Sequence, residues 1–315
     1  MAKTITVTGA LGHIGSALIR NLDPEVTRVH LVDNLHTQRY ASLFGLPARP
    51  KFIFHETDIL SDEMEGIIKG SDAIVHLAAI TDAESSVRNR TLVNRVNKQG
   101  VRKLARLAIR YRIPLVFPST TSVYGVQTGI VDERCPQKDL KPQSPYAGSK
   151  LYAERLLRSL GSKRKLKFVI LRIGTIFGYS IGMRFHTAVN KFIWQACLGQ
   201  EVTVWKTALH QKRPYCDLTD AVNAINHVLR ESLFDREIYN IVTVNSTVSE
   251  IIDTIRLFRP KLAVRLTQSP IMNQLSYAVS RVKSEEKGFS YSGNLKRGIR
   301  ETIRKFAGLR NTQMS

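Results

Sequence analysis

Three glycines near the N-terminus restrict the fold of this chain more than any other feature. Gly9, Gly12 and Gly15 form one turn. A β-branched run, residues 3–8, precedes the turn, and a helical pattern, residues 16–22, follows it. Glycines here let backbone N–H groups approach a pyrophosphate, and the helix N-terminus then stabilises its charge. The spacing differs from the standard Gly-x-Gly-x-x-Gly, but the position between strand and helix predicts a dinucleotide-binding unit.

An acidic residue lies about twenty positions beyond this turn, at the end of a second expected strand, residues 28–32. The Asp33 carboxylate can accept hydrogen bonds from an adenosine ribose and would repel a 2′-phosphate, which favours NAD over NADP. Arg39 could still accept such a phosphate, and Asp33 could instead be a simple cap or turn residue. Asp58 follows a third expected strand and could reach the adenine amino group, or could equally be an ordinary turn residue.

Strands alternate with helices through the first 172 residues, and this alternation predicts a parallel sheet with helices on both faces. The expected class is α/β, a Rossmann-type doubly wound sheet over residues 1–176, with a strand near 237–243 returning to it. Residues 177–315 are expected to form a smaller α+β substrate-binding portion, with a cleft between the two. The pattern predicts strands over 3–8, 28–32, 52–55, 73–77, 115–117, 167–171, 202–205 and 237–242, and helices over 16–22, 92–112, 146–160, 183–198, 220–230, 249–258 and 295–306.

The net charge of +21, from 47 Lys+Arg against 26 Asp+Glu, is unusual for a chain of 315 residues. Such a charge attracts polyanions, but the excess is spread out and no segment interleaves basic and aromatic residues as a nucleic-acid platform does. No apolar run is long enough to cross a bilayer, and the first residues do not read as a signal peptide. The scattered cysteines, Cys135, Cys197 and Cys216, suggest free thiols. A cytoplasmic protein is therefore expected.

Tyr146 and Lys150 are spaced four residues apart, which places them on one face of a helix. An ammonium group beside a phenol favours the phenolate, so the pKa of the tyrosine is expected to fall toward working pH. Such a phenol can take a proton from a substrate alcohol or return one to a carbonyl. The pair alone is a weak signal, and the glycine turn upstream strengthens it.

Together these motifs resemble the extended short-chain dehydrogenase/reductase family, and within it the NAD-dependent nucleotide-sugar epimerases and dehydratases, of the UDP-glucose 4-epimerase kind. The resemblance covers nearly the whole chain and is dense over residues 3–178. It rests on the glycine turn, on Asp33 and Asp58 after their strands, on segments 76–79 and 119–125, and on Tyr146 with Lys150. The residues it implies for NAD are Gly9, Gly12, His13, Ile14, Gly15, Asp33, Asn34, Leu35, Asp58, Ile59, Leu77, Ala78, Ala79, Asn97, Ser119, Tyr146 and Lys150.

The resemblance also implies a mechanism. Tyr146 takes the proton of a sugar hydroxyl while hydride passes to NAD+, Lys150 keeps the phenol acidic, and Thr120 positions the same oxygen. In an epimerase the keto-sugar turns over and takes the hydride back on its other face, so NAD stays bound. The residues implied for the nucleotide-sugar substrate are Thr81, Thr120, Thr121, Tyr146, Thr175, Arg184, Asn190 and Arg213, and no metal is implied.

Departures from the family pattern favour an epimerase over its relatives. The 4,6-dehydratases carry an Asp-Glu pair where Thr121 and Ser122 stand, and UDP-glucuronate decarboxylases keep a glutamate at the position of Ser122. An arginine that the family uses for the substrate diphosphate is absent near residues 273–274. His13 and Arg184 are extra cations that could compensate for it. The carbon most expected to be inverted is C4 of a UDP-hexose or of a uronic or N-acetyl relative.

Two alternatives remain from the sequence. A nucleotide-sugar reductase or an atypical dehydratase would use the same triad, and a non-catalytic protein of the same fold could bind nucleic acid through its positive charge. The retained triad makes nucleic-acid binding the weaker hypothesis. The family also implies a homodimer formed through helices 92–112 and 146–160, unless the many cations of the first helix repel each other without an acid such as Glu154 to face them.

Overall fold

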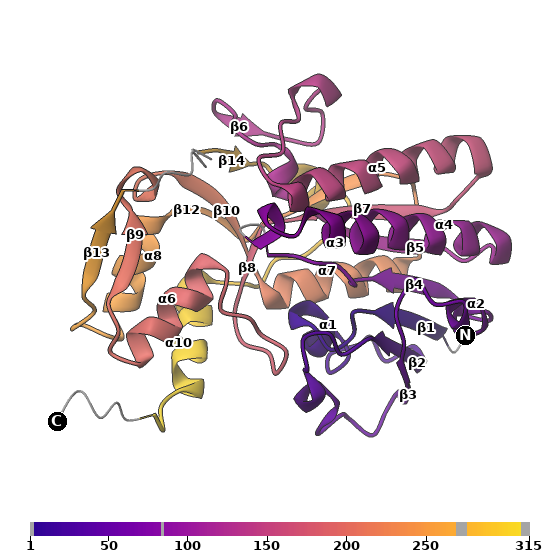
Figure 1. Cartoon of the computed structure of the whole chain (residues 1–315), viewed down its shortest axis with the longest axis horizontal. Helices are drawn as coiled ribbons and strands as arrows, with labels where there is room; N and C mark the ends of the chain where they lie inside the picture. The colour runs from indigo at the N-terminus through magenta and orange to yellow at the C-terminus, as the bar shows by residue number, and fades with distance from the viewer. Residues whose placement is uncertain (1–2, 83–84, 269–275, 310–315) are drawn as a thin grey trace.

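The centre of the molecule is one parallel sheet, seen in a computed structural model that describes residues 3–82, 85–268 and 276–309. Its strands are β1 (Lys3–Thr8), β2 (Val26–Asp33), β3 (Lys51–Glu56), β4 (Ala73–His76), β5 (Leu115–Thr120), β7 (Phe168–Ile173) and β11 (Ile238–Ile241). They lie side by side in the order β11-β7-β5-β4-β1-β2-β3, and every pairing is parallel (Figure 1). The α/β class and doubly wound sheet predicted from the sequence are confirmed.

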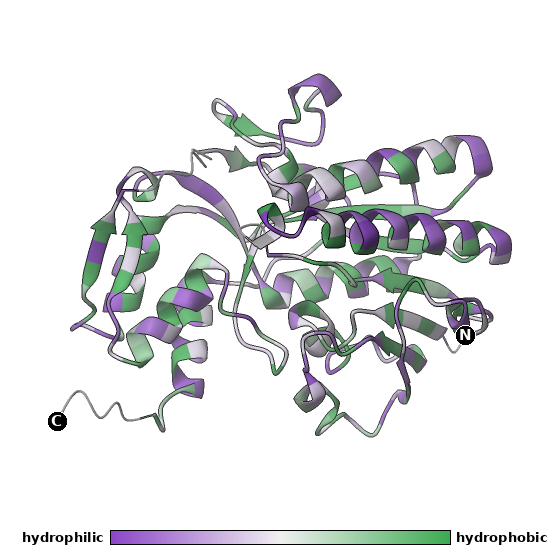
Figure 2. Cartoon of the chain, viewed as in Figure 1, coloured by the Kyte–Doolittle hydropathy of each residue, from purple (hydrophilic) through white to green (hydrophobic). Residues whose placement is uncertain are grey.

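Helices cover both faces of this sheet, which explains why its strands are apolar along most of their length. One face packs against α1 (His13–Leu18) and α7 (Leu218–Glu231), in a core that includes Leu31 and Leu171. The other packs against α2 (Glu63–Ile68), α4 (Gly100–Tyr111) and α5 (Pro145–Arg164), in a core that includes Leu104 and Leu157. Figure 2 shows the strands as largely hydrophobic and the outer sides of α4 and α5 as largely hydrophilic.

The order of the strands reverses between β1 and β4, because the chain moves from β1 to β2 on one side and from β4 to β5 on the other. A doubly wound sheet binds its ligand at such a point, outside the carboxyl ends of the strands. Thr8 and His76 end these two strands side by side, and the Thr8 hydroxyl lies 2.7 Å from Nδ1 of His76. Burial lowers the pKa of His76 to about 3, so a neutral ring joins the strands here.

The second part of the chain forms smaller sheets and a third apolar core, on the left of Figure 1. Its sheet of three strands is ordered β12-β10-β8, and β9 pairs with β13. The elements are β8 (Thr175–Phe177), α6 (Ala188–Cys197), β9 (Val202–Trp205), β10 (Lys212–Asp217), β12 (Val244–Thr247), α8 (Val248–Arg256), β13 (Val264–Thr267) and α10 (Leu295–Lys305). Between β10 and β12 the chain returns to the large sheet as α7 and β11.

The remaining elements are short and mostly connect the larger ones. They are α3 (Arg90–Val93), the π-helix η3 (Asn94–Gln99), β6 (Ile130–Val131), β14 (Ala278–Val279), α9 (Val282–Glu286), and the 3₁₀ turns η1 (Tyr40–Leu43), η2 (Ser85–Val87), η4 (Thr121–Val123), η5 (Gln137–Asp139) and η6 (Lys206–Ala208). Within the described ranges, no helix is long and apolar enough to cross a membrane.

One predicted helix begins later than the sequence suggested. Residues 183–198 were expected to be helical, but α6 begins at Ala188 and residues 178–187 run as an irregular segment. Contacts with the glycine turn hold this segment in place, as described below, and these contacts override its local helical pattern. We call residues 178–187 the strap.

Candidate active site

A cavity of about 490 Å³ opens at the carboxyl edge of the large sheet, between the two parts of the chain. This volume lies within the range usual for small-molecule sites. Of the residues predicted for the cofactor, those lining the cavity are Gly9, Gly12, His13, Ile14, Gly15, Leu77, Ser119, Tyr146 and Lys150. Of those predicted for the substrate, Thr81, Thr120, Thr175, Arg184 and Arg213 also line it.

The glycine turn lies directly against the end of β4. Gly9 has φ +67°, and a Cβ placed there would be 2.6 Å from the backbone nitrogen of Ala78. A Cβ on Gly15 would be 2.5 Å from the carbonyl oxygens of both Gly9 and Ala10. Side chains are therefore excluded at both positions, and the N-terminus of α1 stays open to the cavity. This backbone arrangement suits a pyrophosphate.

Asp33 ends β2 beside this turn. Its carboxylate accepts hydrogen bonds from the backbone nitrogens of Leu11, at 3.1 Å, and Leu35, at 3.0 Å. Asp58 follows β3, and its carboxylate accepts a hydrogen bond from the Asn34 amide at 2.8 Å. Asp33 therefore lies beside the glycine turn, and Asp58 is bonded to it indirectly through Asn34, the residue that follows Asp33.

Some residues predicted for the cofactor are used by the chain itself. The Ile59 side chain is buried under Gly100 of α4, where a Cβ would be 2.2 Å from Ile59 Cδ1. The Asn97 amide, in the π-helix, accepts from Ile80 N at 2.8 Å and donates to Ile80 O at 3.0 Å and to the Ser149 hydroxyl at 2.9 Å. Asn97 thus fastens the loop after β4 to α5, and we assign it a positioning role.

The strap crosses the glycine turn from the substrate side. Ser180 donates from its hydroxyl to the carbonyl of His13 at 2.9 Å, and the backbone nitrogen of Gly182 donates to the Ser16 hydroxyl at 3.0 Å. Arg39 also donates to the Gly182 carbonyl. The approach is so close that a Cβ on Gly182 would be 2.3 Å from the carbonyl oxygen of Leu11. The strap therefore forms the cover of the glycine turn.

His13 is not the extra cation that the sequence suggested. Its Nε2 lies 2.9 Å from the Gly178 carbonyl oxygen, and burial lowers the pKa of the ring to about 4. The imidazole is thus neutral at physiological pH, and its Nε2 carries the proton that bonds the strap. The expected compensation for a missing phosphate-binding arginine cannot come from His13.

The residues predicted to be catalytic come from two adjacent elements. Thr120 ends β5, while Tyr146 and Lys150 lie on the first turns of α5. That helix begins here because Ser144 accepts from the backbone nitrogen of Ala147 at 3.1 Å and because Pro145 occupies the first helical position. All three side chains line the cavity on the side of the large sheet.

The pKa of Tyr146 was expected to fall, but in the protein without ligands it rises. Burial raises the pKa of Tyr146 to about 12, although a hydrogen bond with Thr120 and the charge of Arg184 oppose this rise. Lys150 turns toward the sheet instead, donating to the carbonyl of Pro118 at 2.7 Å and lying 4.6 Å from the centre of the Phe117 ring. Burial lowers the pKa of Lys150 to about 8.

A buried ion pair behind the catalytic helix was not predicted. Glu154 lies one turn beyond Lys150 and pairs with Arg172 of β7 at 2.7 Å, with side chains 0% and 1% exposed. Ser119, which also lines the cavity, donates from its hydroxyl to the same carboxylate at 2.5 Å. The four-residue spacing between Lys150 and Glu154 was the available signal, since it places both on one buried face.

Two residues predicted for the substrate lie outside the cavity lining. Thr121 is 2% exposed and its side chain bonds to Tyr277, because η4 turns it inward after β5. Asn190 is fully buried and accepts from the backbone nitrogen of Gly178 at 3.3 Å, bracing the strap. Neither side chain lines the cavity, so a direct contact of Thr121 or Asn190 with the substrate stays a prediction. The positions at which a diphosphate-binding arginine was found to be absent, Asn273 and Gln274, lie outside the described residues.

Several lining residues were missed by the sequence reasoning. They are Asp82, Arg88, Ser122, Gln143, His186, Trp205 and Tyr215. Trp205 and Tyr215 lie on β9 and β10. An aromatic residue on each of these short strands was the signal that could have identified them as lining residues. His186 was missed because residues 183–198 were expected to form one helix. Within the described parts of the chain, no three His, Cys, Asp or Glu side chains are grouped to hold a metal ion.

Comparison with known proteins agrees with this geometry. The model of the NAD dependent epimerase/dehydratase family matches residues 5–242. The uncharacterized UDP-glucose epimerase YtcB of Bacillus subtilis (strain 168) is 30% identical over 247 residues, which are 75% of this chain and 76% of that protein. A dTDP-glucose 4,6-dehydratase of Streptomyces niveus is 28% identical over 236 residues, 71% of this chain and 68% of that one.

A solved structure is similar over the full length. The UDP-glucose 4-epimerase of Thermus thermophilus, crystallised in complex with NAD, has a TM-score of 0.81 and 26% sequence identity, and the match covers 98% of this chain and 100% of that one. The glycine turn, the acid after β2 and the Thr-Tyr-Lys constellation thus occur in a chain whose sequence and fold agree with one family. The chain belongs to the NAD-dependent epimerase/dehydratase family.

Proposed function

We propose that this protein inverts carbon 4 of a UDP-sugar by transient oxidation to the 4-keto sugar and return of the hydride to the opposite face. The observation that carries this proposal is the cavity itself, which brings Thr120, Tyr146 and Lys150 together with the glycine turn. When bound, NAD+ supplies the hydride acceptor. The backbone of the glycine turn would hold its pyrophosphate, and Asp33 its adenosine ribose.

The proton chemistry belongs to Tyr146 and Thr120. Thr120 bonds the same phenol that is to exchange a proton with the sugar oxygen, which positions both groups. Burial favours the neutral phenol, the form that returns a proton to a carbonyl, whereas the charge of Arg184 favours the phenolate that removes one. A group that must both take and return a proton benefits from such opposing influences.

The scarcity of carboxylates among the described residues that line the cavity favours epimerisation over dehydration. A 4,6-dehydration needs carboxylates near the sugar, whereas Thr121 is buried away from the cavity and Ser122 carries a hydroxyl. Among the described residues that line the cavity, Asp82 carries the single carboxylate, on the loop after β4. An atypical dehydratase that uses Asp82, or a reductase, is the alternative.

Incubation of the purified protein with UDP-, GDP-, CDP- and dTDP-sugars, with the products identified by NMR, tests this proposal. We expect inversion at C4 without added NAD and without net formation of NADH. A 4-keto-6-deoxy product would instead show a dehydratase, and stoichiometric consumption of NAD(P)H would show a reductase. If none of the sugars is inverted by a preparation that retains NAD, the epimerase proposal is wrong.

We further propose a cytoplasmic homodimer that pairs through α4 and α5. No acid lies in residues 90–112, and the single acid of α5, Glu154, is buried against Arg172. The outward cations Arg102 and Arg106 therefore face a second copy without compensation, and Arg102 donates to the Tyr152 hydroxyl on α5.

The association of two copies is thus expected to strengthen as salt screens the repulsion between these cations. Light scattering at about 20 mM and 500 mM salt measures it, and a dimer that weakens in salt would contradict the proposed face.

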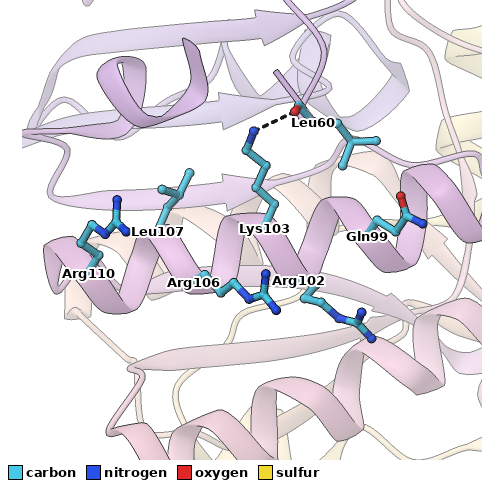
Figure 3. Close-up of a pocket in the computed structure, with 7 residues that line it drawn as sticks. All are labelled: Leu60, Gln99, Arg102, Lys103, Arg106, Leu107 and Arg110. Carbon is cyan, nitrogen blue, oxygen red and sulfur yellow. Dashed lines mark hydrogen bonds between the residues drawn. The ribbon is translucent and has the colours of Figure 1, made fainter. Parts of the chain in front are cut away.

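Nucleic acid is not part of the proposed function, because half of the cationic groove on α4 is already neutralised. Figure 3 shows this groove, in which Lys103 reaches across to the carbonyl of Leu60. Lys103 also pairs with Asp62 at 2.7 Å, and Arg110 pairs with Glu65 at 2.6 Å. Arg102 and Arg106 remain, which is a small footprint for a phosphate backbone.

A further inference from the structure

Large apolar side chains are exposed together on the outer side of the strap. Tyr179 and Ile181 of the strap are 41% and 39% exposed, and Tyr40 and Phe44, in the connection between β2 and β3, are 51% and 68% exposed. Leu309, which follows α10, is 47% exposed. We call these five residues the strap face. Single apolar side chains are usual on a protein surface, but a contiguous group of them marks a binding surface.

Contacts between the three segments bring the strap face onto one side of the molecule. The Arg20 guanidinium donates to the Phe44 carbonyl at 2.6 Å, and the Tyr179 phenol acts electrostatically on the same guanidinium. The Lys305 ammonium lies 4.7 Å from the centre of the Tyr179 ring, four residues before Leu309. Figure 1 shows the connection between β2 and β3, together with α10, on the lower side of the view and β6 at the top.

The strap has its other side toward the cavity. Arg184, His186 and Thr187 line the cavity, whereas Tyr179 and Ile181 are exposed. A partner on the strap face would thus contact the outside of the segment that covers the glycine turn. An inference about this partner does not depend on the proposed reaction.

The segments that carry the strap face are strongly cationic. Residues 34–55 contain three Lys or Arg, residues 178–187 contain one and residues 295–309 contain five. Their single acid is Glu301, whereas the whole chain has 47 Lys and Arg against 26 Asp and Glu. The partner that complements this surface is therefore anionic, and the same surface of a second copy would be repelled.

We propose that the strap face binds the surface of an anionic phospholipid membrane. The cations are attracted to the lipid phosphates, and the exposed apolar side chains enter the boundary between the headgroups and the acyl chains. Tyr40 and Tyr179 suit this boundary, because a tyrosine has an apolar ring and a polar hydroxyl. Nucleic acid also carries phosphates, but Ile181 and Leu309 are aliphatic and cannot stack on bases as aromatic residues do.

Flotation of the NAD-containing protein with lipid vesicles tests the charge contribution. Phosphatidylcholine vesicles with about 30% phosphatidylglycerol should bind the protein at least about 10-fold more tightly than vesicles of phosphatidylcholine alone. Arg304→Gln combined with Lys305→Gln, two exposed cations of α10, should weaken this binding by about 10-fold. The matched control is Lys69→Gln combined with Lys138→Gln. It removes the same net charge from exposed positions beside α2 and in η5, and it should bind within about twofold of the wild type.

A second pair of variants tests the apolar contribution. Tyr40→Ser combined with Phe44→Ser should weaken binding to the anionic vesicles by about 10-fold. It should also abolish the binding that the wild type retains at about 500 mM salt, where the attraction between charges is screened. Val126→Ser combined with Ile130→Ser removes two apolar side chains of similar exposure near β6, and it should bind as the wild type does. Since all these side chains are exposed, every variant should melt at the temperature of the wild type.

Absence of binding to the anionic vesicles would overturn the inference. Equal weakening by the two charge variants would also overturn it, because binding would then follow net charge rather than this surface. So would single-stranded RNA that binds as tightly as the vesicles and is weakened equally by Tyr40→Ser with Phe44→Ser. A change in the molar mass of that variant in light scattering would show that the strap face binds a second copy instead.

Discussion

Replacing Tyr146 by phenylalanine is expected to lower kcat by about 10²–10⁴-fold, because this change removes the group that exchanges the proton with the sugar oxygen. The ring remains, so the packing on the first turn of α5 is kept. The hydrogen bond with Thr120 is lost, but Tyr146 forms no ion pair that the fold needs. Retained NAD, read from the absorbance of the purified protein, and an unchanged melting temperature should accompany the loss. NMR of the sugar product measures the rate.

Tyr152 provides the matched control on the same helix. Its hydroxyl accepts from Arg102, and its ring lies 5.4 Å from the Lys98 ammonium, both outside the cavity. Tyr152→Phe should therefore epimerise at the rate of the wild type. If Tyr146→Phe kept more than about a tenth of the activity, proton exchange would have to occur elsewhere, and the proposed role of Tyr146 would fail.

Replacing Arg172 by methionine is expected to destabilise the protein by about 3–5 kcal/mol, because the Glu154 carboxylate would then be buried without its counter-charge. Denaturation in urea measures the change.

Two further variants decide whether the effect comes from the pair. Arg172→Met combined with Glu154→Leu removes both charges and should recover much of the loss, since an apolar replacement of a whole buried pair is often tolerated. The exposed pair of Arg134 with Asp132 is the surface comparison, and Arg134→Met should leave the urea midpoint unchanged. A double variant no more stable than Arg172→Met would show that shape, not charge, is what the site requires.

The large sheet could be predicted from the sequence because each of its strands is marked by a pattern of neighbouring residues. Strands buried on both faces appear as short apolar runs, as in the residues of β1 and β5, and the glycine turn marks where the first of them ends. The same locality places Tyr146 and Lys150 on one helical face. The fold, the family, and the positions of Thr120 at the end of β5 and of Tyr146 and Lys150 on α5 follow from such patterns.

The parts that were mistaken depend on contacts between distant residues. Residues 183–187 of the strap have a helical pattern, but the preceding residues 178–182 are held by His13, Ser16 and Arg39, more than 140 positions away. Spacing put Lys150 beside Tyr146, yet the ammonium turns to the Pro118 carbonyl, and burial decides the pKa of the phenol. The spacing of two residues predicts neither the direction in which a long side chain points nor how far burial removes it from water.

The strap also limits how this fold can be divided. A fragment ending near residue 176 would contain the strands on either side of the glycine turn, but it would lack the groups that bond Ser16, Arg39 and the His13 carbonyl. We therefore do not expect residues 1–176 to keep the shape of the glycine turn when they are separated from the rest of the chain. A chimera that joins it to the substrate portion of a relative must carry residues 178–187 from this chain, with glycine kept at position 182.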